Sequence, residues 1–79
     1  MNRERRIEIE GIRQEIGEAS SSMKKIIDKE QAVLDNTPET LQETDRYTDA
    51  EDAMEILEAA LEHLEEAFDS LADIVQAGN

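Results

Sequence analysis

Carboxylates are the side chains of this sequence that could do chemistry. The 79-residue chain holds 21 Asp and Glu but eight Lys and Arg, which gives it a formal net charge of −13. Two carboxylates three positions apart lie on one face of a helix, and hard cations such as Mg²⁺ bind oxygen ligands of this kind. The Glu-x-x-Glu and Glu-x-x-Asp pairs with this spacing are Glu15 and Glu18, Glu55 and Glu58, Glu62 and Glu65, and Glu66 and Asp69.

All-α nucleotide pyrophosphohydrolases hold magnesium with Glu-x-x-Glu and Glu-x-x-Asp pairs on facing helices, so a metal-dependent nucleotide hydrolase is one hypothesis. In so acidic a chain, however, such pairs arise by chance, and most of them lie on the outer face. No cluster of Lys or Asn accompanies them to bind a nucleotide. His63 is the single His, and no Glu-x-x-His pair is present to build a metal site in a bundle core. We therefore expect a surface histidine and no metal.

Other catalytic arrangements are missing from the sequence. It has no Cys nucleophile, no Gly-rich phosphate loop and no Ser/His/Asp constellation. A calcium-binding loop that starts at Asp35 fails, because Thr40 and Arg46 occupy the positions that require Gly and Glu. The sequence therefore predicts a protein that is not an enzyme and carries no cofactor.

The helix that must position most of these carboxylates lies in the second half of the chain. Apolar residues recur between positions 47 and 75 at alternating steps of three and four, which is typical of a helix that packs one face against other helices. We predict a helix over about residues 49–76, with a capping box that starts at Thr48 and with Gly78 just past the end. A start near Thr44 is the alternative.

A second stripe of mostly small residues runs one position before the first. It consists of Ala53, Ala60, Ala67 and Ile74. Together the two stripes make a face wider than one partner helix needs, and a lone hairpin would leave Ile56 and part of this face in water. We expect a homodimer that closes as a four-helix bundle, with a monomeric three-helix arrangement as the alternative. The residues expected to mediate self-association are Met54, Leu57, Ala60, Leu61, Leu64, Ala67, Phe68 and Leu71.

A weaker amphipathic pattern predicts the first helix, over about residues 2–34. Its apolar stripe consists of Ile9, Ile12, Ile16, Ala19, Met23, Ile26 and Val33, and it is widened by Ile27 and Leu34. Gly11, Gly17 and the run Ser20–Ser22 are poor helix formers. They fit a long helix with a soft centre, and they also fit a bend or a close approach by a neighbouring backbone.

Residues 35–48 form the expected connector. Pro38 disfavours helical geometry at the residue before it and cannot continue the first helix. Thr37 can cap a short helical turn over about residues 38–43, with Leu41 pointing inward. The predicted fold is therefore all-α: one domain, residues 1–79, in which a short helical connector joins two long antiparallel helices.

The acidic balance limits the partners of this protein. A net charge of −13 repels nucleic acid and anionic membranes, so neither is expected as a direct ligand. No apolar run approaches the roughly 18 residues needed to span a bilayer, and the N-terminus lacks the apolar segment of a signal peptide. We expect a cytoplasmic protein of a bacterial host cell.

Most of the negative charge belongs to the second helix, because residues 41–79 hold 12 acidic side chains and one basic side chain. Like charges four positions apart each cost about 0.2–0.5 kcal/mol, and a helix selected for stability alone would interleave Lys. This acidic side either solubilises the protein or recognises a partner protein with a basic surface. The candidate partner-binding residues are Glu55, Glu58, Glu62, Glu65, Glu66 and Asp69.

Two stretches carry a resemblance to a known group of proteins: residues 29–47, with an Asp-Asn-x-Pro-Glu-x-Leu-Gln connector, and the Ala/Met/Glu/Leu repeats after Asp49. Over about residues 29–75 the chain resembles small acidic helical-hairpin proteins of bacterial prophages and mobile elements. The resemblance transfers no activity and no functional residue, but it implies a phage-related accessory protein.

The first functional hypothesis is therefore a non-enzymatic phage-type protein that binds and inhibits a host protein through its acidic side. The target would be a defence protein or a protein that acts on nucleic acid. The alternative is a structural or assembly coiled-coil module whose acidic side only solubilises it.

Overall fold

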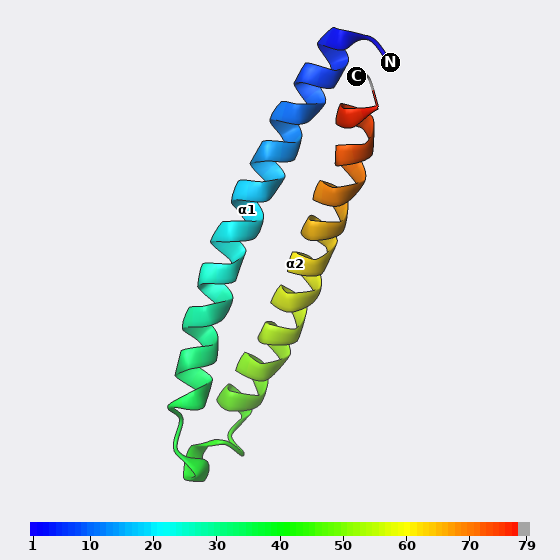
Figure 1. Ribbon diagram of the computed structural model, residues 1–79. Coiled ribbons are helices and arrows are strands. Elements are labelled where there is room, and N and C mark those ends of the chain that lie inside the picture. The colour runs from blue at the N-terminus through cyan, green and yellow to red at the C-terminus, as the bar shows by residue number, and fades with distance from the viewer. Residues whose placement is uncertain (78–79) are drawn as a thin grey trace.

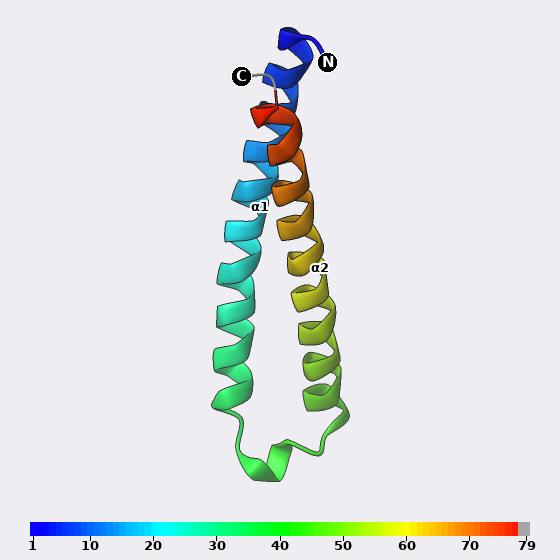
Figure 2. The same ribbon diagram turned by 45° about the vertical axis from the view of Figure 1, so that its right-hand side comes forward.

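Two long antiparallel helices dominate the computed structural model, which describes residues 1–77 (Figure 1). Helix α1 spans Arg3–Asp35, a 3₁₀ turn (η1) spans Glu39–Leu41, and helix α2 spans Asp45–Gln76. The two helices lie side by side along their length in both views (Figures 1 and 2), and the described residues contain no strand. The all-α hairpin expected from the sequence is confirmed. The expected helix stop at Gly78 lies outside the described residues.

Helix α1 begins and ends with polar side chains that satisfy its free backbone groups. The Asn2 Oδ1 atom accepts a hydrogen bond from the Arg5 amide at 2.9 Å. At the other end, Asn36 Nδ2 donates to the Ala32 carbonyl at 2.8 Å, and the Thr37 hydroxyl donates to the Val33 carbonyl at 2.8 Å. Thr37 was expected to cap the short turn that follows. Instead its side chain closes α1.

The connector is shorter than the sequence predicted. Helix α2 begins at Asp45, four residues before the expected start, because Thr44 is its N-cap and its hydroxyl accepts from the Tyr47 amide at 3.3 Å. The alternative start near Thr44 is therefore correct, and the capping box expected at Thr48 is not the helix start. Leu41, which was expected to point inward, remains 50% exposed in η1.

The seam between the helices uses the predicted stripe of α2. Met54 is buried at 5% exposure, and its heptad neighbours are half-buried. These neighbours are Tyr47, Ala50, Leu57, Leu61, Leu64, Phe68, Leu71 and Val75. Helix α2 therefore packs as its 3/4 spacing predicted.

The seam of α1 differs from the predicted stripe. Ile9, Ile16 and Met23 are half-buried as expected. The other members of that stripe lie outside the seam, with Ile12, Ile26 and Val33 exposed by 51%, 48% and 59%, and Ala19 also exposed. A row at seven-residue intervals takes their place and consists of Arg6, Arg13, Ser20, Ile27 and Leu34. Three of the eight residues that α1 contributes to the seam, Arg6, Arg13 and Ser20, are therefore polar.

Candidate functional site

Three surfaces of the hairpin can support a function: an acidic surface on α2, an apolar surface on the opposite side, and a groove between the helices. Each is located by its position relative to the seam. Lys24 directly follows the seam residue Met23, and Glu65 directly follows the seam residue Leu64. Lys24 and Glu65 form an ion pair of 3.5 Å across the seam, so these two positions lie on the same side of the hairpin. Positions just before a seam residue border the opposite side. The first side is polar and leads to the acidic surface of α2, and the second is apolar.

We call the candidate partner-binding residues the acidic face: Glu55, Glu58, Glu62, Glu65, Glu66 and Asp69. All six are exposed, and at 3.6 residues per turn they occupy an arc of about 100° on α2. Within residues 1–77, one of them forms an ion pair, Glu65 with Lys24, and Glu66 Oε2 lies 3.9 Å from the imidazole Nδ1 of His63. The other four carboxylates face solvent without a cation beside them in this part of the chain.

We call the opposite surface the apolar face. Helix α1 supplies Ile12, Ala19, Ile26 and Val33, and α2 supplies Ala53, Ala60, Ala67 and Ile74. Because the helices are antiparallel and Gly17 lies against Phe68, each of these α1 residues lies about level with one α2 residue, as Ile26 does with Ala60. The apolar face therefore runs along most of the hairpin, and three of its β-branched side chains are about half exposed.

The residues expected to mediate self-association are divided between the seam and the apolar face. Met54, Leu57, Leu61, Leu64, Phe68 and Leu71 lie in the seam, where they pack against α1 of the same chain. Ala60 and Ala67 belong to the apolar face. Ile56, which a lone hairpin was expected to leave in water, is 70% exposed in this single chain and extends the apolar face on α2.

A polar crossing joins the two helices in the half of the hairpin that is nearer the chain termini. The Arg13 guanidinium lies over the Phe68 ring, 3.9 Å from the ring centroid, and Arg13 Nε donates to the Phe68 carbonyl at 3.0 Å. A second nitrogen of Arg13, Nη1, lies 3.6 Å from Glu10 Oε1. Arg13 thus makes three different interactions, and two of them, the ring contact and the hydrogen bond, join α1 to α2.

Gly17 lets the ring of Phe68 approach α1. A β-carbon at position 17 would lie 3.0 Å from the ring's Cε2 atom, whereas one at Gly11 would meet nothing within 4 Å. Ser20, one turn further along, is buried, and its hydroxyl donates to the Ile16 carbonyl at 2.9 Å. Of the interpretations open for this region, the long continuous helix is confirmed, and the group that approaches Gly17 is the Phe68 side chain rather than a neighbouring backbone. Helix α1 continues unbroken through Ser20–Ser22.

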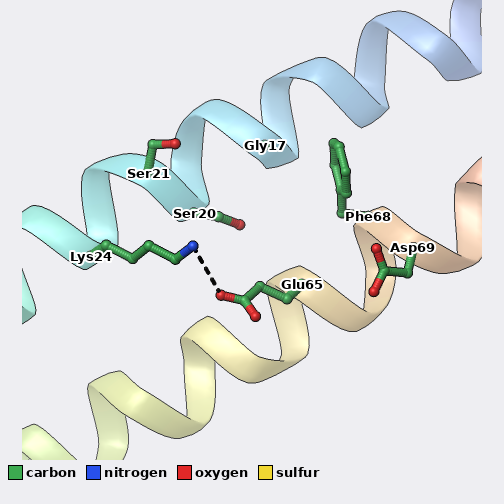
Figure 3. Close-up of a pocket in the computed structure, with 7 residues that line it drawn as sticks. All are labelled: Gly17, Ser20, Ser21, Lys24, Glu65, Phe68 and Asp69. Carbon is green, nitrogen blue, oxygen red and sulfur yellow. Dashed lines mark ion pairs between the residues drawn. The ribbon is translucent and has the colours of Figure 1, made fainter.

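A shallow groove lies on the polar side of this crossing (Figure 3). Gly17, Ser20, Ser21 and Lys24 line it from α1, and Glu65, Phe68 and Asp69 line it from α2. Its cation, Lys24, points to Glu65 across the groove, and the Ser20 hydroxyl is committed to the backbone. The groove therefore offers neither an activated nucleophile nor a convergent set of acid and base groups.

The paired carboxylates of the hydrolase hypothesis lie on the exterior of both helices. Glu15 and Glu18 are exposed on α1, and Glu66 and Asp69 are exposed on α2. Within residues 1–77, no three His, Cys, Asp or Glu side chains converge so that they could hold a metal ion.

Sequence reasoning missed Arg13 and Ser20, because polar residues do not enter an apolar stripe. A signal for them was present, since stepping back by sevens from the apolar pair Leu34 and Ile27 leads to Ser20, Arg13 and Arg6. The same interval of seven governs α2, and two packed helices share one repeat.

Comparisons with known proteins add no relative to this description. No protein-family model, no curated protein and no solved structure matches the chain. Neither helix of the described residues has an apolar stretch that would let it cross a membrane. What the molecule itself defines is a class: an acidic, antiparallel two-helix hairpin with a thin core.

Proposed function

We propose that this protein is a non-enzymatic interaction protein that binds a partner with a basic surface through the acidic face. The observation that carries the proposal is the exposure of all six carboxylates on one side of α2. Within residues 1–77, only Glu65 pairs with a Lys or Arg side chain, and Glu66 lies beside the imidazole of His63. Carboxylates aligned along a rigid helix attract and orient a basic partner, and they suppress binding to acidic ones.

The internal cost of the acidic face favours recognition over solubility. Glu58 and Glu62, Glu62 and Glu66, and Glu65 and Asp69 are like-charged pairs one helical turn apart, and each pair costs about 0.2–0.5 kcal/mol. Solubility needs charge but not this concentration of one sign on one face. When a basic partner binds, its cations offset the repulsion between these carboxylates.

The partner class proposed is a host protein that acts in defence or on nucleic acid, and the effect proposed is inhibition. A row of carboxylates can occupy the surface that such a protein uses for phosphates. The resemblance of residues 29–75 to small acidic prophage proteins supports the choice of a host target inside a bacterial cell.

Capture from a bacterial lysate, followed by an activity assay of the captured protein, tests this proposal. The decisive variant is Glu58→Lys with Glu62→Lys, because these carboxylates carry no ion pair to α1. Glu65→Lys would instead place a second cation beside Lys24 and disturb the hairpin. We expect the double variant to lose at least about tenfold in affinity for a partner that the unaltered protein captures and inhibits.

The matched control is Glu15→Lys with Glu18→Lys, which changes the net charge by the same amount on exposed positions of α1. The control variant should bind as the unaltered protein does. An equal loss of affinity in both variants would mean that the partner responds to net charge and not to the acidic face. Unchanged binding in the Glu58/Glu62 variant would exclude the acidic face as the binding surface. Circular dichroism of each variant verifies that the helices persist.

A second candidate function is an assembly module whose acidic face only keeps it in solution. The apolar face favours this candidate, because it offers a coiled-coil surface independent of the acidic face. The two functions differ in the same experiment, since an assembly module captures no partner through Glu58 and Glu62.

A further inference from the structure

The apolar face is the largest feature of the hairpin that the acidic-face proposal does not use. We infer that a second copy of this chain covers the apolar face, so that two hairpins close a four-helix bundle. The inference is independent of the proposed function, because it concerns the opposite side of the molecule. Exposed area, charge and side-chain size each support it.

The hairpin exposes more surface than a compact chain of its mass. Its accessible surface is 6149 Å², whereas a compact monomer of 8.9 kDa exposes about 4,800 Å². The excess of about 1,300 Å² is larger than the roughly 800 Å² that each partner buries in a standard interface. No described side chain is exposed by less than 2%, so the chain by itself lacks a fully buried core. A second hairpin supplies the missing layer.

Charge selects the face through which two copies can meet. Each copy carries −13, so contact through the acidic faces would bring like charges together. The apolar face contains no ionisable side chain, and it lies on the opposite side of the seam from Glu65. Pairing through it keeps both acidic faces in solvent and leaves them free for another partner.

Side-chain size makes the apolar face complementary to a copy of itself. On α1 it carries Ile12, Ile26 and Val33, which are bulky, and on α2 three of its four residues are Ala. If α1 of one copy lies over α2 of the other, bulky side chains meet small ones at both places related by the two-fold axis. The same arrangement sets the two acidic α2 helices diagonally across the bundle.

Sedimentation equilibrium tests the inference directly. We expect the unaltered protein to have twice the chain mass of 8.9 kDa at micromolar concentration. Ile26→Glu, which places a charge in the middle of the apolar face, should raise the dimer dissociation constant by about 100-fold or more. The matched control is Ile7→Glu, an exposed isoleucine of α1 that lies outside the face, and it should leave the dimer mass unchanged.

An obligate dimer could unfold when Ile26 is replaced, so a measurement on the unaltered chain accompanies the variants. In a sample that mixes isotope-labelled and unlabelled protein, intermolecular nuclear Overhauser effects should connect the methyl groups of Ile26 and Val33 with alanine methyl groups of the second copy. None should involve Ile7. Helix content should fall on dilution together with the dimer mass if folding and pairing are linked.

Three outcomes would overturn the inference. One is a mass of 8.9 kDa for the unaltered protein at about 100 μM, which would leave the apolar face to a different protein or to solvent. Another is a dimer that persists in a folded Ile26→Glu variant. The third is a set of intermolecular Overhauser effects confined to residues outside the apolar face.

Discussion

The ring of Phe68 lies directly against the backbone of Gly17, at a distance that leaves no room for a β-carbon without a shift. On the same helix Arg13 lies over the ring, 3.9 Å from its centroid. Phe68 is thus contacted by a glycine and an arginine that lie one turn apart on α1. Gly17, which lowers the helix propensity of α1, is therefore the residue that lets α2 pack closely against it.

The two glycines of α1 should respond differently to alanine. Gly11→Ala should raise the free energy of unfolding by about 1 kcal/mol, because alanine is the better helix former and a β-carbon meets nothing there. Gly17→Ala gains the same propensity but must displace the Phe68 ring by a few tenths of an ångström. We expect it to be neutral or destabilising by up to about 1 kcal/mol. Urea unfolding at one protein concentration measures both, and an equal gain in both variants would contradict the close approach.

Arg13 should stabilise the hairpin more than any exposed cation of α1 does. Arg13→Met keeps the aliphatic stem but removes the contact with the Phe68 ring and the hydrogen bond to its carbonyl. The expected loss is about 1–2 kcal/mol of unfolding free energy. The control is Lys25→Met, which makes the same charge change at an exposed position and should cost under about 0.5 kcal/mol. Equal losses would mean that charge alone, and not the crossing, is responsible.

The start of α2 can be tested at two threonines. Thr44 caps the helix through the Tyr47 amide, and its hydroxyl also donates to the Leu41 carbonyl at 2.8 Å. Thr44→Ala should therefore destabilise the protein by about 1 kcal/mol. Thr48 is exposed inside the helix, so Thr48→Ala should be neutral or slightly stabilising. The reverse order of effects would move the helix start back to the position suggested by the capping-box pattern.

Salt should stabilise this protein. Like charges are crowded on α2, and ionic strength screens repulsion between exposed groups over about 10 Å at 0.1 M. The exposed Lys24–Glu65 pair is screened as well, but exposed pairs contribute little. We expect the melting temperature to rise by several degrees between low salt and about 0.5 M sodium chloride.

The replacement of Glu58 and Glu62 by glutamine provides the control for this effect. It should raise the melting temperature at low salt and reduce the gain from sodium chloride, because it removes carboxylates from the like-charged pairs. A melting temperature that falls with salt would show that attraction between charges, and not repulsion, dominates the hairpin.

The seam of α2 follows directly from its amino acids. Its apolar residues form a single row at steps of three and four, with acids on the far side, so burial of that row satisfies the hydrophobic effect in only one way. The break near Pro38, and the hairpin that it implies, also follow from a short stretch of the sequence. The cap at Thr44 was visible as an alternative to Thr48, because two threonines four positions apart offer the same capping chemistry.

The sequence by itself determined two helices, their hairpin connection and the face that α2 presents to α1. The tertiary structure decided which apolar residues of α1 face α2, because that helix has two rows at helical spacing and either could be buried. Packing against α2 selected Ile9, Ile16 and Met23, together with the polar Arg13 and Ser20, and it left Ile12, Ile26 and Val33 outside. The physical reason is the close approach at Gly17, which fixes the rotation of α1 about its axis once the Phe68 ring lies against it.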